Sequence, residues 1–123
     1  MGELSPRLGL PRGRRITRGR DFLRARSVGR RLAVGCLVMN WTDAAEGATR
    51  LGVITSRKLG KAVVRTRARR LLREAFRRNQ YKVTGPVDLV LVARSSIVGK
   101  GLADVETDFM TALQRAGLLS RNT

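Results

Sequence analysis

The chain has 123 residues, the length of one domain with one modest core. Its 26 Lys and Arg residues against 9 Asp and Glu residues give a net charge of +17, while a hydrophobic content of 42% is that of a folded protein. Because so much like charge repels itself, this composition predicts a polyanionic partner, with nucleic acid first and an anionic membrane surface second. The sequence has no histidine, the commonest general base and metal ligand, and its single cysteine excludes an intramolecular disulfide.

Cys36 lies in an apolar run and is expected to be a small buried hydrophobe rather than a nucleophile. A chain without disulfides favours a reducing compartment, so we expect the protein in the cytoplasm. The apolar stretches are too short to span a bilayer, and the N-terminus lacks the apolar segment of a secretory signal. The arginine-rich N-terminus also suits a transit peptide, but less well, because the basic charge resumes further along the chain.

The basic charge is concentrated in two parts of the chain. Residues 1–31 hold ten Arg and two acidic residues, and residues 50–82 hold twelve basic residues and one acidic residue. Residues 32–49 carry only two charged residues, both acidic, and residues 83–123 balance four basic against four acidic residues. The polyanion is therefore expected to meet an N-terminal arm and a central segment.

Residues 1–15 show no periodicity and predict a flexible basic arm. Thr17 is the candidate N-cap of a short helix that runs to about Arg26 and ends before Gly29. We treat residues 16–117 as a single domain and residues 118–123 as a C-terminal tail.

Three β-prone segments follow the first helix. Residues 32–41 are apolar and long enough for one strand, and residues 51–55 read as its returning partner, with residues 43–49 as the hairpin loop. After a turn at residues 84–86, residues 87–93 form a nearly continuous apolar run that suits the centre of a sheet.

The strongest pattern predicts a helix from Val64 to about Asn79 or Tyr81. Its apolar residues recur at helical spacing and occupy one face: Val64, Ala68, Leu71, Leu72, Ala75 and Phe76. Its one acidic residue, Glu74, stands four residues after Arg70, where an ion pair can form. Residues 104–116 predict a further amphipathic helix that Gly117 ends. The order of elements indicates an α+β fold with helices packed against a small sheet.

The central helix carries arginines at four-residue spacing, where like charges repel: Arg65, Arg69, Arg73 and Arg77. Guanidinium groups bind phosphate through paired hydrogen bonds and stack on bases, so this pattern favours a phosphate backbone over a merely solvated face. The preceding residues 56–61 form either an anion site at the helix N-terminus or an ordinary basic turn. Phe22 stands among arginines that would flank a stacked base, although composition alone favours a core anchor.

Residues 52–77 read Gly-Val-Ile-Thr-Ser-Arg-Lys-Leu-Gly-Lys-Ala-Val-Val-Arg-Thr-Arg-Ala-Arg-Arg-Leu-Leu-Arg-Glu-Ala-Phe-Arg. This segment closely resembles the signature of the bacterial ribonuclease P protein component. That signature is a strand ending in a Ser-Lys-Lys-type loop, a Gly-x-Ala-Val step and an Arg-Asn-Arg helix. The flanks at residues 18–22, 29–31 and 88–94 are also similar to the family, and the resemblance covers about residues 14–116.

The resemblance implies an α-β-β-β-α-β-α fold, a ribosomal-protein-like domain with a left-handed βαβ crossover. It implies the protein subunit of a ribonucleoprotein endoribonuclease that removes the 5′ leader from precursor tRNA. In that family the RNA subunit and its Mg²⁺ ions carry out the hydrolysis, so no residue of this chain is expected to be catalytic or to bind a metal. The implied partners are the catalytic RNA and precursor tRNA, with no DNA and no membrane.

Position by position, the resemblance implies RNA contacts from nine basic residues: Arg57, Lys58, Lys61, Arg65, Arg67, Arg69, Arg70, Arg73 and Arg77. It implies a cleft for the single-stranded leader lined by Phe22, Asn40, Arg65, Thr66 and Arg69. Thr66 replaces the asparagine of the Arg-Asn-Arg motif, and Arg26 and Asn40 stand where the family often has aromatic residues. Leader contacts are therefore expected to be more electrostatic than stacked.

Two other functions compete with this one. A structural ribosomal protein would also have an arginine-rich helix and an arm that folds on RNA, but it would not need the ordered signature of residues 52–77. A DNA-binding module would need base-reading side chains at the start of its helix, where Thr66 and Ala68 stand.

Overall fold

The structure is a computed structural model that describes residues 14–44 and 47–120, so most of the predicted arm and the end of the predicted tail lie outside the described residues. The elements in chain order are α1 (Gly19–Ser27), β1 (Arg30–Val34), β2 (Leu37–Asp43), β3 (Arg50–Ile54), α2 (Ala62–Asn79), β4 (Val87–Ala93) and α3 (Leu102–Ala116). Short 3₁₀ helices occupy Arg57–Leu59, Gln80–Lys82 and Ser95–Ile97. This is the α-β-β-β-α-β-α order that the resemblance implies.

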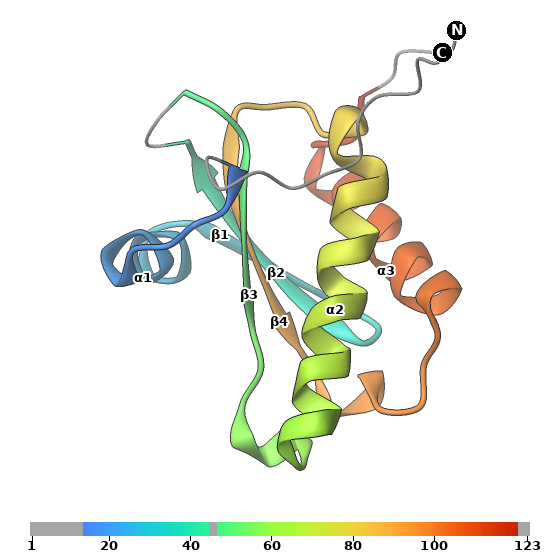
Figure 1. Ribbon diagram of the computed structural model, residues 1–123. Helices are drawn as coiled ribbons and strands as arrows, with labels where there is room; N and C mark the ends of the chain where they lie inside the picture. The colour runs from blue at the N-terminus through green and yellow to red at the C-terminus, as the bar shows by residue number, and fades with distance from the viewer. Residues whose placement is uncertain (1–13, 45–46, 121–123) are drawn as a thin grey trace, which may run out of the picture.

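The strands form one mixed sheet in the order β1-β2-β4-β3 (Figure 1). β2 pairs antiparallel with β1 and with β4, whereas β3 pairs parallel with β4. The parallel pair is connected through α2, as a parallel pair requires a long crossover. β4 is an interior strand whose residues are almost all buried, as its continuous apolar run predicts.

The structure corrects two strand predictions. Residues 32–41 do not form one strand, because a turn at Gly35 and Cys36 divides them between β1 and β2. Gly35 has a φ of +53°, a left-handed conformation that glycine adopts without steric cost. Residues 43–49 are not a hairpin loop, because β4 lies between β2 and β3. A strand from later in the chain takes the place that the hairpin prediction gave to residues 51–55.

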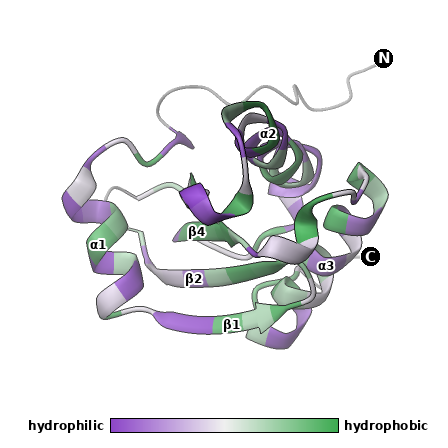
Figure 2. Ribbon diagram, turned by 90° about the horizontal axis from the view of Figure 1, so that it is seen from below, coloured by the Kyte–Doolittle hydropathy of each residue, from purple (hydrophilic) through white to green (hydrophobic). Residues whose placement is uncertain are grey.

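Two helices cover one face of the sheet and α1 covers part of the other face (Figures 1 and 2). The predicted apolar face of α2 packs into the larger core, where the Phe76 ring meets the Phe109 ring of α3 edge to face at 6.3 Å between centroids. A smaller cluster lies under α1 and contains Ile16, Ala25 and Val90. Among the described residues, no helix combines the length and apolar character needed to cross a membrane.

The helix ends differ slightly from prediction. Arg18 is the N-cap of α1 and no side chain caps that end, so the prediction for Thr17 is wrong. α3 begins at Leu102, two residues before the predicted start, and Gly117 ends it with a φ of +75°, as predicted. Cys36 is buried, and this burial, with help from Asp108, raises the pKa of its thiol to about 12. The thiol therefore stays neutral, which confirms the structural interpretation of Cys36.

Candidate nucleic-acid interface

The chain segment before α1 runs beside the edge strand β3. The backbone N–H of Ile16 donates to the carbonyl of Leu51 at 2.8 Å, and Arg15 pairs with Leu51 as an isolated parallel bridge. Arg14 donates its Nε to the carbonyl of Thr49. These contacts hold Arg15 at the edge of the sheet, on the side where α2 passes.

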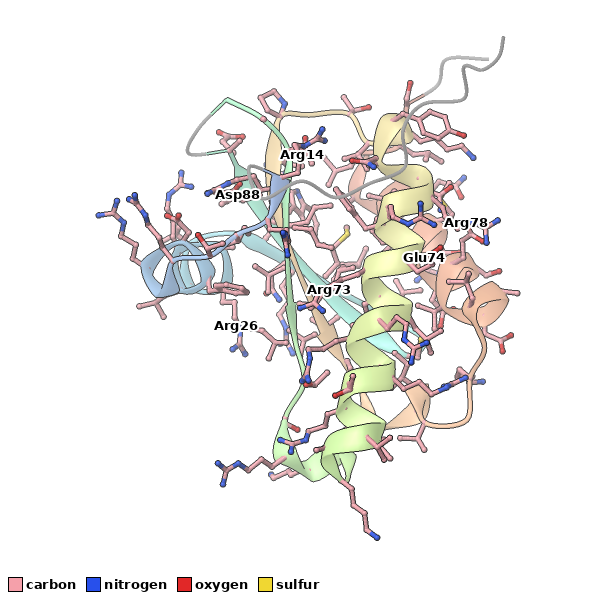
Figure 3. All side chains as sticks on the ribbon, viewed as in Figure 1. Arg14, Arg26, Arg73, Glu74, Arg78 and Asp88 are labelled. Carbon is pink, nitrogen blue, oxygen red and sulfur yellow. The ribbon has the colours of Figure 1, made fainter. Side chains whose placement is uncertain are left out.

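A groove of about 290 Å³ separates this segment from α2, and we call it the basic groove. Its lining residues are Arg15, Thr66, Arg70, Arg73, Glu74 and Arg77. Figure 3 shows the Arg73 side chain reaching from α2 into the space beside β3. Arg69, one turn before Arg73, donates to Thr55 Oγ1 at 2.7 Å and to Thr66 Oγ1 at 3.2 Å, which holds its guanidinium near the same space.

The basic groove has an electrostatic environment suited to an anion. Partial burial lowers the pKa of Arg73, and the positive charges of Arg69 and Arg15 lower it further. In the part of the chain that the structure describes, none of these three guanidinium groups forms an ion pair. Because the three cations repel one another, a phosphate placed among them would be held by several charges at once.

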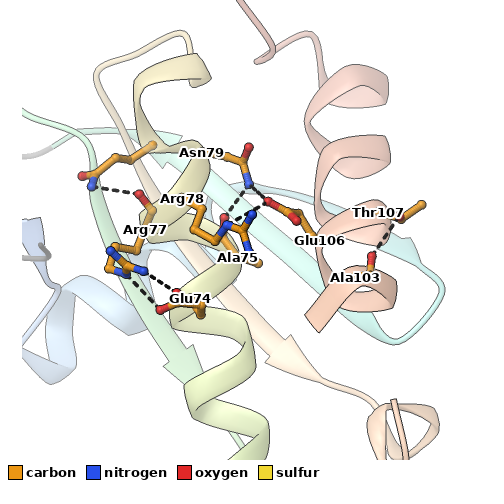
Figure 4. A network of polar contacts seen from close by, with 9 residues as sticks. Glu74, Ala75, Arg77, Arg78, Asn79, Ala103, Glu106 and Thr107 are labelled. Atoms are coloured by element: carbon orange, nitrogen blue, oxygen red, sulfur yellow. Dashed lines mark hydrogen bonds and ion pairs between the residues drawn. The ribbon is translucent and has the colours of Figure 1, made fainter. Parts of the chain in front are cut away.

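Arg77, a predicted RNA contact that lines the basic groove, already has a counter-ion. Glu74 accepts hydrogen bonds from Arg77 and not from Arg70, so the predicted pairing of Glu74 with Arg70 is wrong (Figure 4). The bonds from Arg77 hold the pKa of Glu74 below its ordinary value, and the same bonds raise the pKa of Arg77. The positive charge of Arg77 is therefore partly offset before any RNA arrives.

The other predicted RNA contacts lie along α2 and at its start. The residues with exposed side chains are Arg57, Lys58, Lys61, Arg67, Arg70 and Arg73, and the half-buried ones are Arg65, Arg69 and Arg77. Leu59 is buried and fixes the loop before α2, while Lys61 stands at the N-cap position without a side-chain cap. Three cations therefore surround the positive end of the helix dipole, the arrangement that a phosphate favours.

The aromatic side chain of the predicted leader cleft lies on the opposite face of the sheet from α2. The Phe22 ring packs on the backbone of β3 at Gly52, where a Cβ atom would collide with the ring. A groove of about 410 Å³, which we call the α1 groove, opens beside the ring. It is lined by Gly19, Phe22, Leu23, Arg26, Ser27 and Ile54.

The structure does not bring the five predicted cleft residues into one groove. Asn40 is only 3% exposed and sits in β2 between Arg31 and Val90, outside the lining of the α1 groove. The other three, Arg65, Thr66 and Arg69, belong to α2. At the end of β3, Ile54 lines the α1 groove, and the next residue, Thr55, accepts the hydrogen bond from Arg69 of α2.

Two arginines have roles that the sequence pattern did not assign. Arg15 falls within the predicted arm, yet it lines the basic groove. Arg50 belongs to the basic central segment, yet it is only 4% exposed and binds the buried carboxylates of Asp88 and Asp21. The hydrogen bonds with Asp88 raise the pKa of Arg50 above its ordinary value. An aspartate inside the apolar run of residues 87–93 was the available signal, because a buried carboxylate needs a cation.

The acidic side chains of the described residues are mostly dispersed or bound to other groups of the protein. None of them belongs to a group of three or more His, Cys, Asp or Glu side chains that would hold a metal ion. Asp21 and Asp88 lie close together but bind Arg50, and Asp108 accepts a hydrogen bond from the backbone of Cys36. These three carboxylates therefore already have partners within the folded chain.

Comparisons with known proteins identify the family of this chain. Residues 10–117 match the protein family described as Ribonuclease P. The chain is 35% identical to the ribonuclease P protein component of Syntrophomonas wolfei over 108 residues, which covers 88% of this chain and 91% of that one. It is 34% identical to the component of Clostridium kluyveri over 85% of this chain and 95% of that one.

Solved structures give the same result. A mutant of the Staphylococcus aureus RNase P protein superposes with a TM-score of 0.79 at 26% identity, covering 87% of this chain and 91% of that one. The RNase P protein of Thermotoga maritima superposes with a TM-score of 0.74 at 28% identity, covering 82% and 96%. The match of sequence, element order and sheet means that this chain belongs to the ribonuclease P protein family.

Proposed function

We propose that this chain is the protein subunit of a ribonuclease P ribonucleoprotein that assists removal of the 5′ leader from precursor tRNA. The observation that carries the proposal is the basic groove, where Arg15 and Arg73, with Arg69 close to Arg73, have no carboxylate partner among the described residues. Family membership supports the RNA of ribonuclease P as the polyanion that this groove would bind. A cytoplasmic location is supported by the single, buried cysteine.

Binding to the RNA subunit would use the arginines of α2 and the cations at its start. Contacts between arginine and phosphate position an RNA without reading its sequence, so we expect tolerance to base changes in the contacted strands. Each neutralised phosphate releases counterions, so we expect the affinity to fall steeply as salt rises. Arg65, Arg67, Arg69, Arg70 and Arg73 would supply most of these contacts, and Arg77 would supply less because Glu74 offsets its charge.

The leader would bind in the α1 groove and continue over the end of β3. The half-buried Phe22 ring would offer a surface for base stacking, and Arg26 would offer a cation for the backbone at the same groove. Thr66 and Arg69 would contact the strand further along, because Arg69 is anchored at Thr55, next to the groove residue Ile54. Asn40 would act indirectly, since β2 buries it.

We place the hydrolysis itself in the RNA subunit and its Mg²⁺ ions. Two observations support this division of labour. The buried carboxylates Asp21 and Asp88 both bind Arg50, and the buried thiol of Cys36 is held neutral. The side chains that face solvent around the basic groove are mainly cations, which bind and orient a polyanion rather than activate a nucleophile.

The test is cleavage of precursor tRNA by a bacterial ribonuclease P RNA at low Mg²⁺, with and without this protein. We expect correct 5′ cleavage to appear only with the protein, because its cations offset the phosphate repulsion that Mg²⁺ otherwise screens. No stimulation, together with tight binding to ribosomal RNA and co-sedimentation with ribosomal subunits, would instead establish the structural ribosomal role.

A further inference from the structure

The face of the sheet under α1 contains a buried ionic network of three residues. Arg50 in β3 donates from Nε to Asp88 Oδ1 at 3.0 Å and from Nη2 to Asp88 Oδ2 at 2.9 Å. The same Nη2 lies 3.3 Å from Oδ2 of Asp21, in the first turn of α1. Asp88 is only 1% exposed, and Arg50 and Asp21 are also buried. The network therefore joins α1 to two neighbouring strands.

The two halves of this network have different structural consequences. Arg50 and Asp88 face each other across the parallel pair β3–β4, and their two short hydrogen bonds already neutralise the guanidinium. Asp21 adds a second carboxylate from a different element, with its Oδ2 at 3.3 Å from Nη2 of Arg50. The first contact joins the two strands, whereas the second joins α1 to β3.

α1 has few other attachments to the sheet. Ala25 is its one fully buried apolar residue and Phe22 is half-buried, while Leu23 is 67% exposed. Arg24 donates to the carbonyl of Asp43 at 3.0 Å from the exposed side of the helix. The apolar cluster under α1 is small, and the contact between Asp21 and Arg50 adds a charged attachment at the start of the helix.

The contact between Asp21 and Arg50 lies next to Phe22, one of the residues that line the α1 groove. Phe22 follows Asp21 in α1, and Gly52, against which the Phe22 ring packs, lies two residues after Arg50 in β3. Alternate residues of a strand share a face, so Arg50 and Gly52 hold consecutive residues of α1. A shift of Asp21 away from Arg50 would therefore move the Phe22 ring and change the width of the groove.

We propose that Asp21 is a positioning residue for the precursor-tRNA leader. Its contact with Arg50 fixes the start of α1 against β3, and with it the groove wall that Phe22 forms. Asp21 is buried and acts through Phe22 rather than by touching RNA. The inference rests on the proposed function, because it assigns the α1 groove to the leader.

The test compares Asp21→Asn with the wild-type protein in the complex with ribonuclease P RNA. The substitution keeps the shape and one acceptor oxygen, removes the charge that attracts Arg50, and leaves the Arg50–Asp88 pair intact. We expect the affinity for precursor tRNA to fall about threefold to tenfold, within the range of coupling between contacting residues. The affinities for mature tRNA and for the RNA subunit should stay unchanged.

Glu106→Gln is the matched control. Glu106 also joins two elements, since it accepts a hydrogen bond from Asn79 at 2.7 Å and lies 3.7 Å from Arg78, but it does so between α3 and α2 (Figure 4). We expect this variant to bind precursor and mature tRNA as the wild type does. Asp21→Glu keeps the charge and should restore most of the preference for precursor tRNA.

A double-variant cycle separates positioning from general stability. If Asp21 acts through Phe22, Asp21→Asn should add little to the loss caused by Phe22→Ala. Additive losses, equal losses for precursor and mature tRNA, or a weakened RNA-subunit complex would overturn the positioning role. A wild-type complex that does not prefer precursor tRNA would instead overturn the proposed function, and the inference with it.

Discussion

At the scale of single residues, what sets each arginine apart is whether a carboxylate already binds it. Arg50 is fully committed to Asp88 and Asp21, and Arg77 is largely committed to Glu74. Arg69 and Arg73 are held in place only by hydroxyl contacts or by packing, with no ion pair among the described residues. The sequence does not distinguish these arginines, but only those without an ion pair retain their full charge for binding RNA.

Glu74→Gln should therefore release Arg77 for RNA. The substitution removes the carboxylate that lowers the effective charge at this end of the basic groove. We expect the slope of log affinity for the RNA subunit against log salt to steepen by about 0.7 to 0.9, the value of one additional phosphate contact. Binding titrations across a salt series would measure the slope, and a slope equal to that of the wild type would show that Arg77 does not reach RNA.

Phe22→Ala tests the α1 groove. Stacking of a base on an aromatic ring contributes about 1–3 kcal/mol. The free energy of binding precursor tRNA in the complex with the RNA subunit should therefore become less favourable by that amount. Mature tRNA lacks the leader and should bind as before. Equal weakening of both tRNAs would mean that Phe22 only anchors α1 to the sheet.

At the scale of elements, β3 positions both grooves. Its Gly52 receives the Phe22 ring on one face, and its end places Thr55 within reach of Arg69 from α2. The edge of β3 also pairs with the segment that carries Arg15. One strand thus fixes the α1 groove and the basic groove relative to each other.

Gly52→Ala should disturb the α1 groove without changing the basic groove. The added methyl group would collide with the Phe22 ring, so α1 must shift, and overpacking of this kind costs about 1–3 kcal/mol of stability. Thermal unfolding should show that loss, and the preference for precursor over mature tRNA should decrease. Gly101→Ala is the control, because a Cβ at Gly101 meets no atom within 4 Å and Gly101 lines neither groove. An unaltered preference in Gly52→Ala would contradict the role of this contact.

The elements were predictable to the extent that their signals are local. The helical spacing of apolar residues from Val64 to Phe76 gave α2, and the continuous apolar run of residues 87–93 gave β4 with the bounds that the structure has. The order of strands could not be predicted from local signals, because β4 begins 33 residues after Ile54 and yet lies between β2 and β3 in the sheet. The turn at Gly35 was hidden by apolar neighbours on both sides.

The site was predictable in its charge and less so in its geometry. The arginine spacing of α2 correctly indicated a cationic side of that helix, but ion pairs depend on side-chain reach, which spacing does not give. Glu74 binds Arg77, which follows it by three residues, rather than Arg70, which precedes it by four residues. Asn40 was assigned to the cleft by its position in the family pattern, and the structure places it in the interior of the sheet.

At the scale of the whole molecule, the net charge of +17 opposes the compact state. We expect the free protein to gain stability as salt screens this repulsion, with its Tm rising by about 4–8 °C for each kcal/mol gained. Inorganic polyphosphate should give a larger increase at the same ionic strength, because it occupies the basic groove. A Tm that is independent of salt and of polyphosphate would show that the charge is already balanced within the folded chain.

The central claim is that the basic groove beside α2 is where the backbone of the RNA subunit binds. The direct test measures affinity for ribonuclease P RNA across a salt series for the wild type, for the double variant Arg69→Ala, Arg73→Ala, and for Arg78→Ala. Arg78 is a matched control on the same helix, but it points toward Glu106 of α3 (Figure 4).

We predict that the double variant binds more weakly and that its slope is shallower by about 1.4 to 1.8, the value of two phosphate contacts, while Arg78→Ala keeps nearly the wild-type slope. A double variant with the wild-type slope, or an equal loss in Arg78→Ala, would contradict the assignment of the basic groove to the RNA subunit.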